Sequence, residues 1–392
     1  MTLFSRNELT IRISRFQHYL REKHIAAALL TANSDLYYFT GSIQRGMLLI
    51  PAEGEAVYFV RKHLDRARRE SPLLVEPFEP AQISERLSTT AAIGIAADVM
   101  TVAERDLIAA KIVPQKSVLV DISQSLALTK MVKTAAELSL IAKAAEINRA
   151  VHHYAREVFR PGMRDSDMQV AIESYARREL GHPGSFWLRG PHMEGGMSLV
   201  VTGTAALEPT YTDFPIGGRG LSPAVAQGAS GEAIRDYFVV DFIGAHHGYA
   251  ADSTRTYFIG RPPEKVACLY EDLRLFLDKV VAFTTSGITG EEAWNYATSL
   301  VGDCKWRDGF MGLDAKVRFL GHGIGVEVNQ LPVIAAKQKT PFENGMVIAI
   351  EPKVFVPDWG IVGIENTYVM ENGRLRSLTG EIESLDEMII AS

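Results

Sequence analysis

The strongest signal for the fold lies in residues 346–367, which read MVIAIEPKVFVPDWGIVGIENT. The run 346–350 is apolar and rich in strand-forming residues, so it predicts a buried strand that ends at Glu351. After a turn around residues 357–360, Glu365 follows fourteen positions after Glu351, again among apolar residues. A carboxylate in such surroundings is costly unless it is paired or bound to a metal ion. The stretch therefore predicts a hairpin that presents two carboxylates to a cation.

A second stretch, residues 239–260, repeats this design as VVDFIGAHHGYAADSTRTYFIG. Asp241 ends an apolar strand, residues 246–248 predict a hairpin turn, and Asp252 lies eleven positions after Asp241. Because eleven is odd, we expect the turn or a bulge to shift the register by one, so that both carboxylates share a face. The sequence thus predicts two hairpins of the same kind, each with a pair of acidic side chains.

One histidine completes a set of five potential metal ligands. His322 lies between glycines in FLGHGIGVEV, residues 319–328. A single acidic residue of this kind is more typical of a turn or a helix cap, and a single histidine between glycines is more typical of a loop. The paired carboxylates and the histidine together favour a metal site. Four carboxylates and one imidazole suit Mn²⁺, Co²⁺, Fe²⁺ or Zn²⁺. Five ligands are too many for one tetrahedral zinc and suit two ions about 3.5–4 Å apart.

These motifs resemble those of the pita-bread metallopeptidases, which include prolidase, aminopeptidase P and methionine aminopeptidase. The resemblance rests on the order Asp, Asp, His, Glu, Glu and on the motifs around His322, Glu351 and Glu365. Residues 27–31 and 35–41 resemble the first strand and following turn of the extra domain in the prolidase and creatinase branch. The resemblance implies an α+β pita-bread catalytic domain at residues 129–392, preceded by an α/β creatinase-type domain at residues 1–128.

The pattern of apolar residues agrees with two domains. An amphipathic helix is predicted over residues 9–22, and Thr134 with Glu137 forms a capping box that starts a long helix. Thr289 and Glu292 form a second capping box, so the second domain reads as two similar halves, each with helices followed by a carboxylate hairpin. Further predicted elements are strands at residues 26–30, 47–50, 57–59 and 118–120 and a helix at residues 166–180.

The resemblance implies hydrolysis of an amide bond by a hydroxide that bridges two divalent ions, with Mn²⁺ or Co²⁺ favoured and Zn²⁺ or Fe²⁺ as alternatives. It makes His322 and Glu351 the catalytic residues, and Glu351 is expected to move the proton. The leading expectation is an Xaa-Pro-type aminopeptidase or dipeptidase that acts on a small peptide as a homodimer. Two alternatives stay open: a creatinase-like hydrolase of a small amide, and a binding protein that has lost catalysis.

The residues that handle substrate in the family are changed in this chain. Asn329 stands where a second histidine follows His322 by seven positions, and Ala224 stands where another cleft histidine is expected. Gly363 replaces an arginine that proline-specific members carry two positions before the last glutamate. His192 or the nearby Glu194 is a candidate to replace a lost histidine, and exposed loop residues are the alternative reading.

Composition narrows the protein class. Of 392 residues, 47% are hydrophobic and 22% are charged, and the net charge of −6 argues against nucleic-acid binding. The basic stretch 61–70 predicts a solvated helix face. Cys268 and Cys304 are the two cysteines, for which free thiols are favoured over a disulfide. Neither a signal peptide nor an apolar run of about 18–20 residues is found, so we expect a cytoplasmic protein without membrane contact.

Overall fold

The computed structural model describes residues 2–190, 196–212, 214–314 and 316–391, and these divide into two compact units. The first unit holds residues 2–130 with Arg189 and Gly190, and the second holds the described residues from Met131 to Leu188 and from Gly196 onward. Among the described residues, no helix is both long and apolar enough to cross a membrane. Both cysteines are free thiols, as the sequence favoured.

The first unit is built on one mixed sheet of order β4-β3-β2-β1-β5-β6. Its core is made of alternate side chains of these strands, such as Leu29, Leu49, Phe59 and Ile93, packed against helix residues such as Ile108. The predicted strands and the first helix are present, whereas β4 and β5 were not predicted from sequence. The elements are α1 (Arg6–Glu22), β1 (Ile25–Leu30), α2 (Asn33–Thr40), β2 (Gly46–Pro51), β3 (Val57–Val60), α3 (Leu64–Glu70), β4 (Leu74–Pro77), α4 (Pro80–Glu85), β5 (Ala92–Ile95), α5 (Val102–Lys111), β6 (Val118–Asp121) and α6 (Ser123–Met131).

The predicted turn over residues 35–41 is wrong, because this segment is helix α2. Gly41 ends the helix in the left-handed conformation, with φ 75° and its N–H donated to the carbonyl of Tyr37. The helix carries large aromatic side chains on its buried face, and Asp35 in its first turn suits the positive end of the helix dipole. The basic stretch forms α3, which is largely exposed as predicted.

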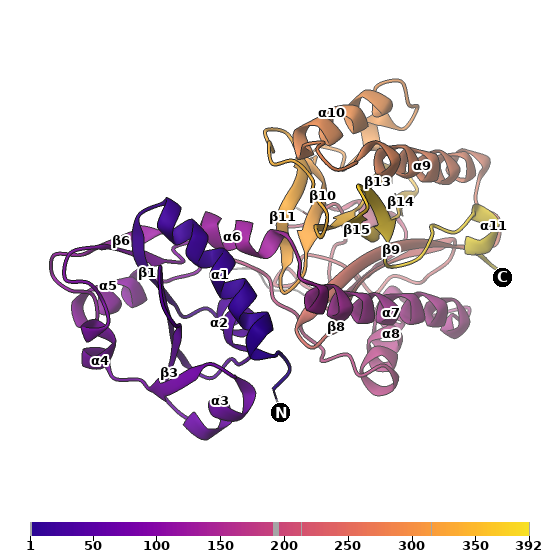
Figure 1. The fold of residues 1–392 in the computed structure, drawn as a ribbon. Helices are drawn as coiled ribbons and strands as arrows, with labels where there is room; N and C mark the ends of the chain where they lie inside the picture. Colours follow the sequence, from indigo (N-terminus) through magenta and orange to yellow (C-terminus); the bar gives the residue numbers. More distant parts are fainter. Residues whose placement is uncertain (1, 191–195, 213, 315, 392) are drawn as a thin grey trace. The chain divides into compact units, whose positions relative to one another are not determined.

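The second unit begins with two helices that pack on the first carboxylate hairpin. Helix α7 starts at the predicted Thr134–Glu137 capping box and packs on β8 and β9 (Figure 1). Helix α8 packs on β7. Two polar side chains on the buried face of α7 hold the hairpin: Asn148 donates to the carbonyls of Phe242 and Ala251, and His152 lies 2.9 Å from the hydroxyl of Ser253. The elements are α7 (Ala135–Val158), α8 (Asp165–Glu179), β7 (Ser198–Val201), η1 (Thr204–Leu207), β8 (Tyr237–His246) and β9 (Tyr249–Ile259).

The second half of this unit repeats the order of helices, sheet and carboxylate hairpin. Helix α10 starts at the predicted Thr289–Glu292 capping box and packs on β11 (Figure 1). The sheet order is β11-β10-β12-β15-β16, with β13 and β14 as a separate two-stranded ribbon. The elements are α9 (Glu264–Phe283), α10 (Gly290–Val301), η2 (Arg307–Gly309), β10 (Phe319–Ile324), β11 (Val328–Ala335), β12 (Val347–Ile350), β13 (Lys353–Val356), β14 (Gly360–Gly363), β15 (Asn366–Glu371), β16 (Arg374–Ser377), α11 (Leu385–Met388) and β17 (Ile389–Ile390).

The first hairpin places its two aspartates on one face without a register shift. Asp241 pairs with Thr254 and Ile243 pairs with Asp252, in an uninterrupted antiparallel ladder. The expected shift of one residue is therefore wrong. His247 and Gly248 form a two-residue turn with φ of 45° and 78°, and such a turn pairs residues whose separation is odd. Asp252 pairs with Ile243, which lies two positions after Asp241 on the same strand. The side chains of Asp241 and Asp252 therefore lie on the same face of the hairpin as diagonal neighbours.

The two hairpins are joined directly. The backbones of Thr254 and Glu365 exchange hydrogen bonds, and the Thr254 hydroxyl donates to Glu365 Oε2 at 2.6 Å. The buried Arg255 guanidinium donates to the carbonyl of Glu365 and to the side chain of Asn366. These bonds satisfy polar groups that water cannot reach. They bring the carboxylates of both hairpins to one place in the second unit.

Candidate metal centre

The second hairpin sets its two glutamates opposite each other. Ile350 pairs with Asn366 in the β12–β15 ladder, and Lys353 pairs with Gly363 in the β13–β14 ladder. Glu351 and Glu365 lie between these two ladders, at facing positions of the same pair of strands. Their exposed fractions are only 4% and 1%. Both carboxylates are therefore held inside the second unit, within 2.7 and 3.4 Å of Lys353 Nζ.

His322 is held in the tautomer that suits a metal ligand. It lies on β10, paired with Ala349 of the neighbouring β12, and is buried. Its Nδ1 lies 3.2 Å from the carbonyl oxygen of Gly323, which accepts only if Nδ1 carries the proton. The Nε2 lone pair is then free for a cation. Burial lowers the pKa of His322, which keeps the ring neutral.

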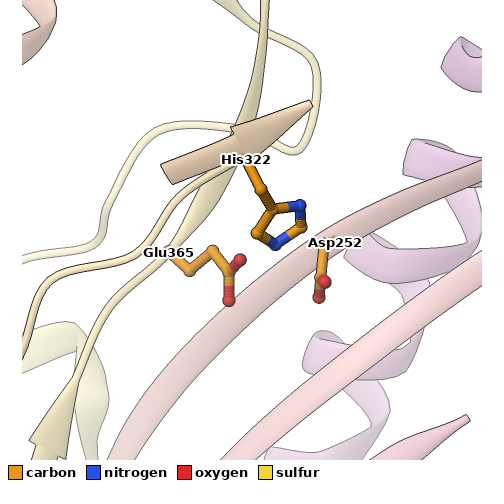
Figure 2. Close-up of side chains that lie close together, drawn as sticks. All are labelled: Asp252, His322 and Glu365. Carbon is orange, nitrogen blue, oxygen red and sulfur yellow. The ribbon is translucent and has the colours of Figure 1, made fainter. Parts of the chain in front are cut away.

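Three of the predicted ligands converge with geometry suited to one ion. Asp252, His322 and Glu365 each offer a ligand atom within 4.8 Å of the other two (Figure 2). Asp252 Oδ1 and Glu365 Oε1 are buried and have no hydrogen-bond partner among the described residues. Unpartnered buried carboxylate oxygens are costly, and a divalent ion would pair with both of them. These residues therefore fit a bound metal ion.

Asp241 and Glu351 instead make contact with a lysine that the sequence analysis did not single out. The Nζ atom of Lys353 lies 2.7 Å from Glu351 Oε2, 3.3 Å from Asp241 Oδ2 and 3.4 Å from Glu365 Oε2. The side chain of Lys353 is fully buried. The available signal was its spacing, because a lysine two positions after Glu351 in an apolar strand must point to the same side as that glutamate.

Burial and mutual repulsion shape the electrostatics of the site. Burial raises the pKa of Glu351 and of Glu365 to about 7, and the charge of Lys353 opposes this rise. Burial and the neighbouring carboxylates raise the pKa of Asp252 well above its usual range. Burial alone would lower the pKa of Lys353, but the three carboxylates raise it more, so its ammonium stays charged. The cluster is thus an anionic site that favours cations.

A cavity opens onto these ligands. Asn329 lines it with an Oδ1 atom that has no partner within the described ranges, and Gln227, which sequence reasoning missed, lines it with an equally unpaired Nε2. Ala224 is exposed and is not among the described residues that line the cavity, and its role in substrate binding stays a prediction. His192 and Glu194 lie outside the described residues. The remaining lining is mostly apolar, including Phe186, Leu188, Phe214, Ile216 and Val328.

Comparison with known proteins defines the class. Residues 139–372 match metallopeptidase family M24, and residues 12–132 match the creatinase/prolidase N-terminal domain. The chain therefore belongs to metallopeptidase family M24 and is a hydrolase of that class. The predicted pita-bread domain with its N-terminal creatinase-type domain is confirmed.

Individual relatives agree over nearly the whole chain. The Xaa-Pro dipeptidase of Pyrococcus furiosus is 24% identical over 378 residues, covering 95% of this chain and 99% of the relative. The prolidase structure from Pyrococcus horikoshii OT3 matches with a TM-score of 0.78 at 23% identity and covers 96% of this chain and 100% of that one. A dipeptidase structure from Mycobacterium ulcerans gives a TM-score of 0.80 at 24% identity, with 99% and 100% covered. At these identities the two structures establish the likeness of the fold.

Proposed function

We propose that the protein is a metal-dependent amide hydrolase of the Xaa-Pro type, an aminopeptidase or dipeptidase, with Mn²⁺ or Co²⁺ favoured and Zn²⁺ or Fe²⁺ as alternatives. The observation that carries the proposal is the buried group Asp252, His322 and Glu365, with two unpaired carboxylate oxygens beside an apolar cavity. The Xaa-Pro dipeptidase relatives, such as that of Pyrococcus furiosus, support this substrate class. We also propose a homodimer with domains at residues 1–128 and 129–392, on the basis of the family resemblance, and we keep a cytoplasmic location as a proposal.

Asp252, His322 and Glu365 would hold the metal, and Asp241 and Glu351 belong to the same acidic cluster. A bound divalent ion supplies Lewis acidity, which polarises a carbonyl group and makes water a nucleophile near neutral pH. Glu351 is the proposed carrier of the proton, because its carboxyl lines the cavity and burial brings its pKa to about 7. A group with a pKa near the working pH can both accept and return a proton.

The cavity walls indicate how a substrate would be oriented. Phe186, Leu188 and Phe214 provide apolar surface for a side chain such as the proline ring. Asn329 offers an acceptor and Gln227 a donor, both unpaired within the described part of the chain. Together they can bind one amide group, which presents an N–H and a carbonyl.

A hydrolase of small neutral amides is the second candidate. The described lining of the cavity includes no lysine or arginine, so no cation there pairs with the free carboxylate of a dipeptide. The Asn329 and Gln227 pair is neutral and suits an uncharged amide. This observation favours two substrate classes over dipeptides. One is longer peptides, which an aminopeptidase would cleave, and the other is small neutral amides.

A substrate panel with metal-loaded protein tests the proposal. Xaa-Pro dipeptides, longer Xaa-Pro peptides and small neutral amides are compared by kcat/KM with Mn²⁺ or Co²⁺ present. Glu351→Gln should lower kcat by about 10²–10⁴ while keeping the side chain's size. The matched control is Glu343→Gln, an exposed glutamate ahead of β12, which should retain activity. Absence of hydrolysis across the panel by the loaded protein would contradict the proposal.

A further inference from the structure

We infer that the ammonium of Lys353 takes the place of one of the two divalent ions, so that the site holds a single metal ion between Asp252, His322 and Glu365. This inference rests on the metal-dependent function proposed above and narrows it. It departs from the two-ion site that the sequence predicts. Its basis is the way the four carboxylates and the imidazole divide between Lys353 and the group formed by Asp252, His322 and Glu365.

The donors fall into two overlapping sets: Glu365 belongs to both, and Glu351 Oε1 of the first set lies 3.5 Å from His322 Nε2 of the second. Lys353 Nζ contacts Asp241, Glu351 and Glu365 at 3.3, 2.7 and 3.4 Å. The other set is Asp252, His322 and Glu365, whose ligand atoms lie within 4.8 Å of one another. Glu365 serves both, because its Oε2 faces Lys353 and its Oε1 is unpaired within the described ranges. One set is therefore already filled by a cation, and the other offers unpaired oxygens.

The backbone directs the lysine to this position. Lys353 is the first residue of β13 and lies two positions after Glu351, which stands between β12 and β13. Its Nζ lies 2.7 Å from Glu351 Oε2. Lys353 is fully buried, so its ammonium has no route to solvent and must pair with groups inside the site. The acidic cluster supplies those partners at salt-bridge distance.

Gly363 leaves the room that the lysine chain occupies. It is the cross-strand partner of Lys353 in the β13–β14 ladder. A Cβ atom at position 363 would lie 2.9 Å from Lys353 Cγ, closer than side chains pack. The glycine that replaces the expected arginine is thus matched to the lysine. The residues at positions 353 and 363 are therefore both consistent with a lysine side chain that points into the site.

Charge balance agrees with one ion. Four carboxylates, Asp241, Asp252, Glu351 and Glu365, surround the site together with one neutral imidazole. The ammonium and one divalent ion together supply three positive charges to a cluster that carries at most four negative ones. A second divalent ion would have to enter next to the ammonium, where like charges repel in a buried setting. The lysine therefore excludes the second ion by occupying its donors and by its charge.

The test counts metal ions in the full-length protein. After loading with Mn²⁺ and desalting, metal analysis should give about one ion per chain, and electron paramagnetic resonance should show isolated Mn²⁺ without exchange coupling. Lys353→Ala removes the ammonium and should bind about two ions, with the coupled spectrum of a pair. Lys353→Arg keeps a cation at this position and serves as the matched control, with one ion expected.

Each outcome separates this inference from the proposed function. Two coupled ions in the unmodified protein, with hydrolysis intact, would overturn the role of Lys353 and leave the proposed hydrolase in place. No bound ion after loading would overturn both. A folded Lys353→Ala protein that still binds one ion would also overturn the inference. If Lys353→Ala does not fold, the spectrum of the unmodified protein decides between one ion and a coupled pair.

Discussion

His152 links the stability of the catalytic unit to pH, and the size of the effect follows from its surroundings. The ring is buried on α7, with Nδ1 2.9 Å from the hydroxyl of Tyr257 and Nε2 2.9 Å from that of Ser253. Burial, reinforced by the charge of Arg255, lowers the pKa of His152 to about 3. Ser253 adjoins the metal-site residue Asp252 in sequence, so this histidine supports the strand that carries it.

The sign follows from the difference between the folded and unfolded states. An unfolded histidine has a pKa of about 6.5, so above that pH the ring is neutral in both states. As the pH falls from 6.5 towards 3, the unfolded chain gains a proton that the folded protein does not take up at His152. Stability is therefore lost on acidification. Between pH 7 and pH 5 the loss from this one residue is about 2 kcal/mol.

Urea unfolding of the unmodified protein and of His152→Gln at pH 7 and pH 5 measures this loss. Glutamine can retain hydrogen bonds but cannot titrate, so the variant should lose about 2 kcal/mol less on acidification. The raised pKa values of Glu351 and Glu365 are common to both proteins, so their effects cancel in the comparison. His153→Gln, which removes an exposed imidazole, is the matched control and should follow the unmodified protein. Equal pH dependence in the unmodified protein and His152→Gln would refute the buried neutral imidazole.

Three further substitutions probe the site. Arg255→Met should lower the free energy of unfolding by about 3 kcal/mol, because it leaves the carbonyl of Glu365 and the side chain of Asn366 without a buried donor. Urea unfolding measures this loss. The control is Arg261→Met, which removes an exposed guanidinium and should change the free energy of unfolding little. Asp252→Ala should abolish tight metal binding, as measured by metal analysis, and an unchanged metal content would exclude it as a ligand. Asn329→His should raise kcat/KM for Xaa-Pro peptides relative to small neutral amides, and an unchanged ratio would remove Asn329 from substrate recognition.

Much of the site follows from chemistry that is local in the sequence. The two hairpins, the capping boxes at Thr134 and Thr289, and the donor set around His322 follow from short-range patterns of apolar, turn and acidic residues. Such patterns reflect two local properties: side chains alternate between the two faces of a strand, and a carboxylate among apolar neighbours is costly unless it is paired. For that reason the sequence by itself predicted two carboxylate hairpins and their candidate ligands, and the resemblance of these motifs to a known family implied the fold class, although the need for a register shift between Asp241 and Asp252 was overestimated.

Contacts between distant segments decided the rest. The sequence does not reveal that Lys353 reaches Asp241, more than a hundred positions earlier, or that Ala224 is exposed while Gln227 lines the cavity. These facts depend on which strands pair across the two hairpins and on which side chains are then excluded from water. Burial turns a lysine that would be solvated on a surface into an internal cation among carboxylates. Only the tertiary structure, by removing water from that position, determined which donors remain open to a metal ion.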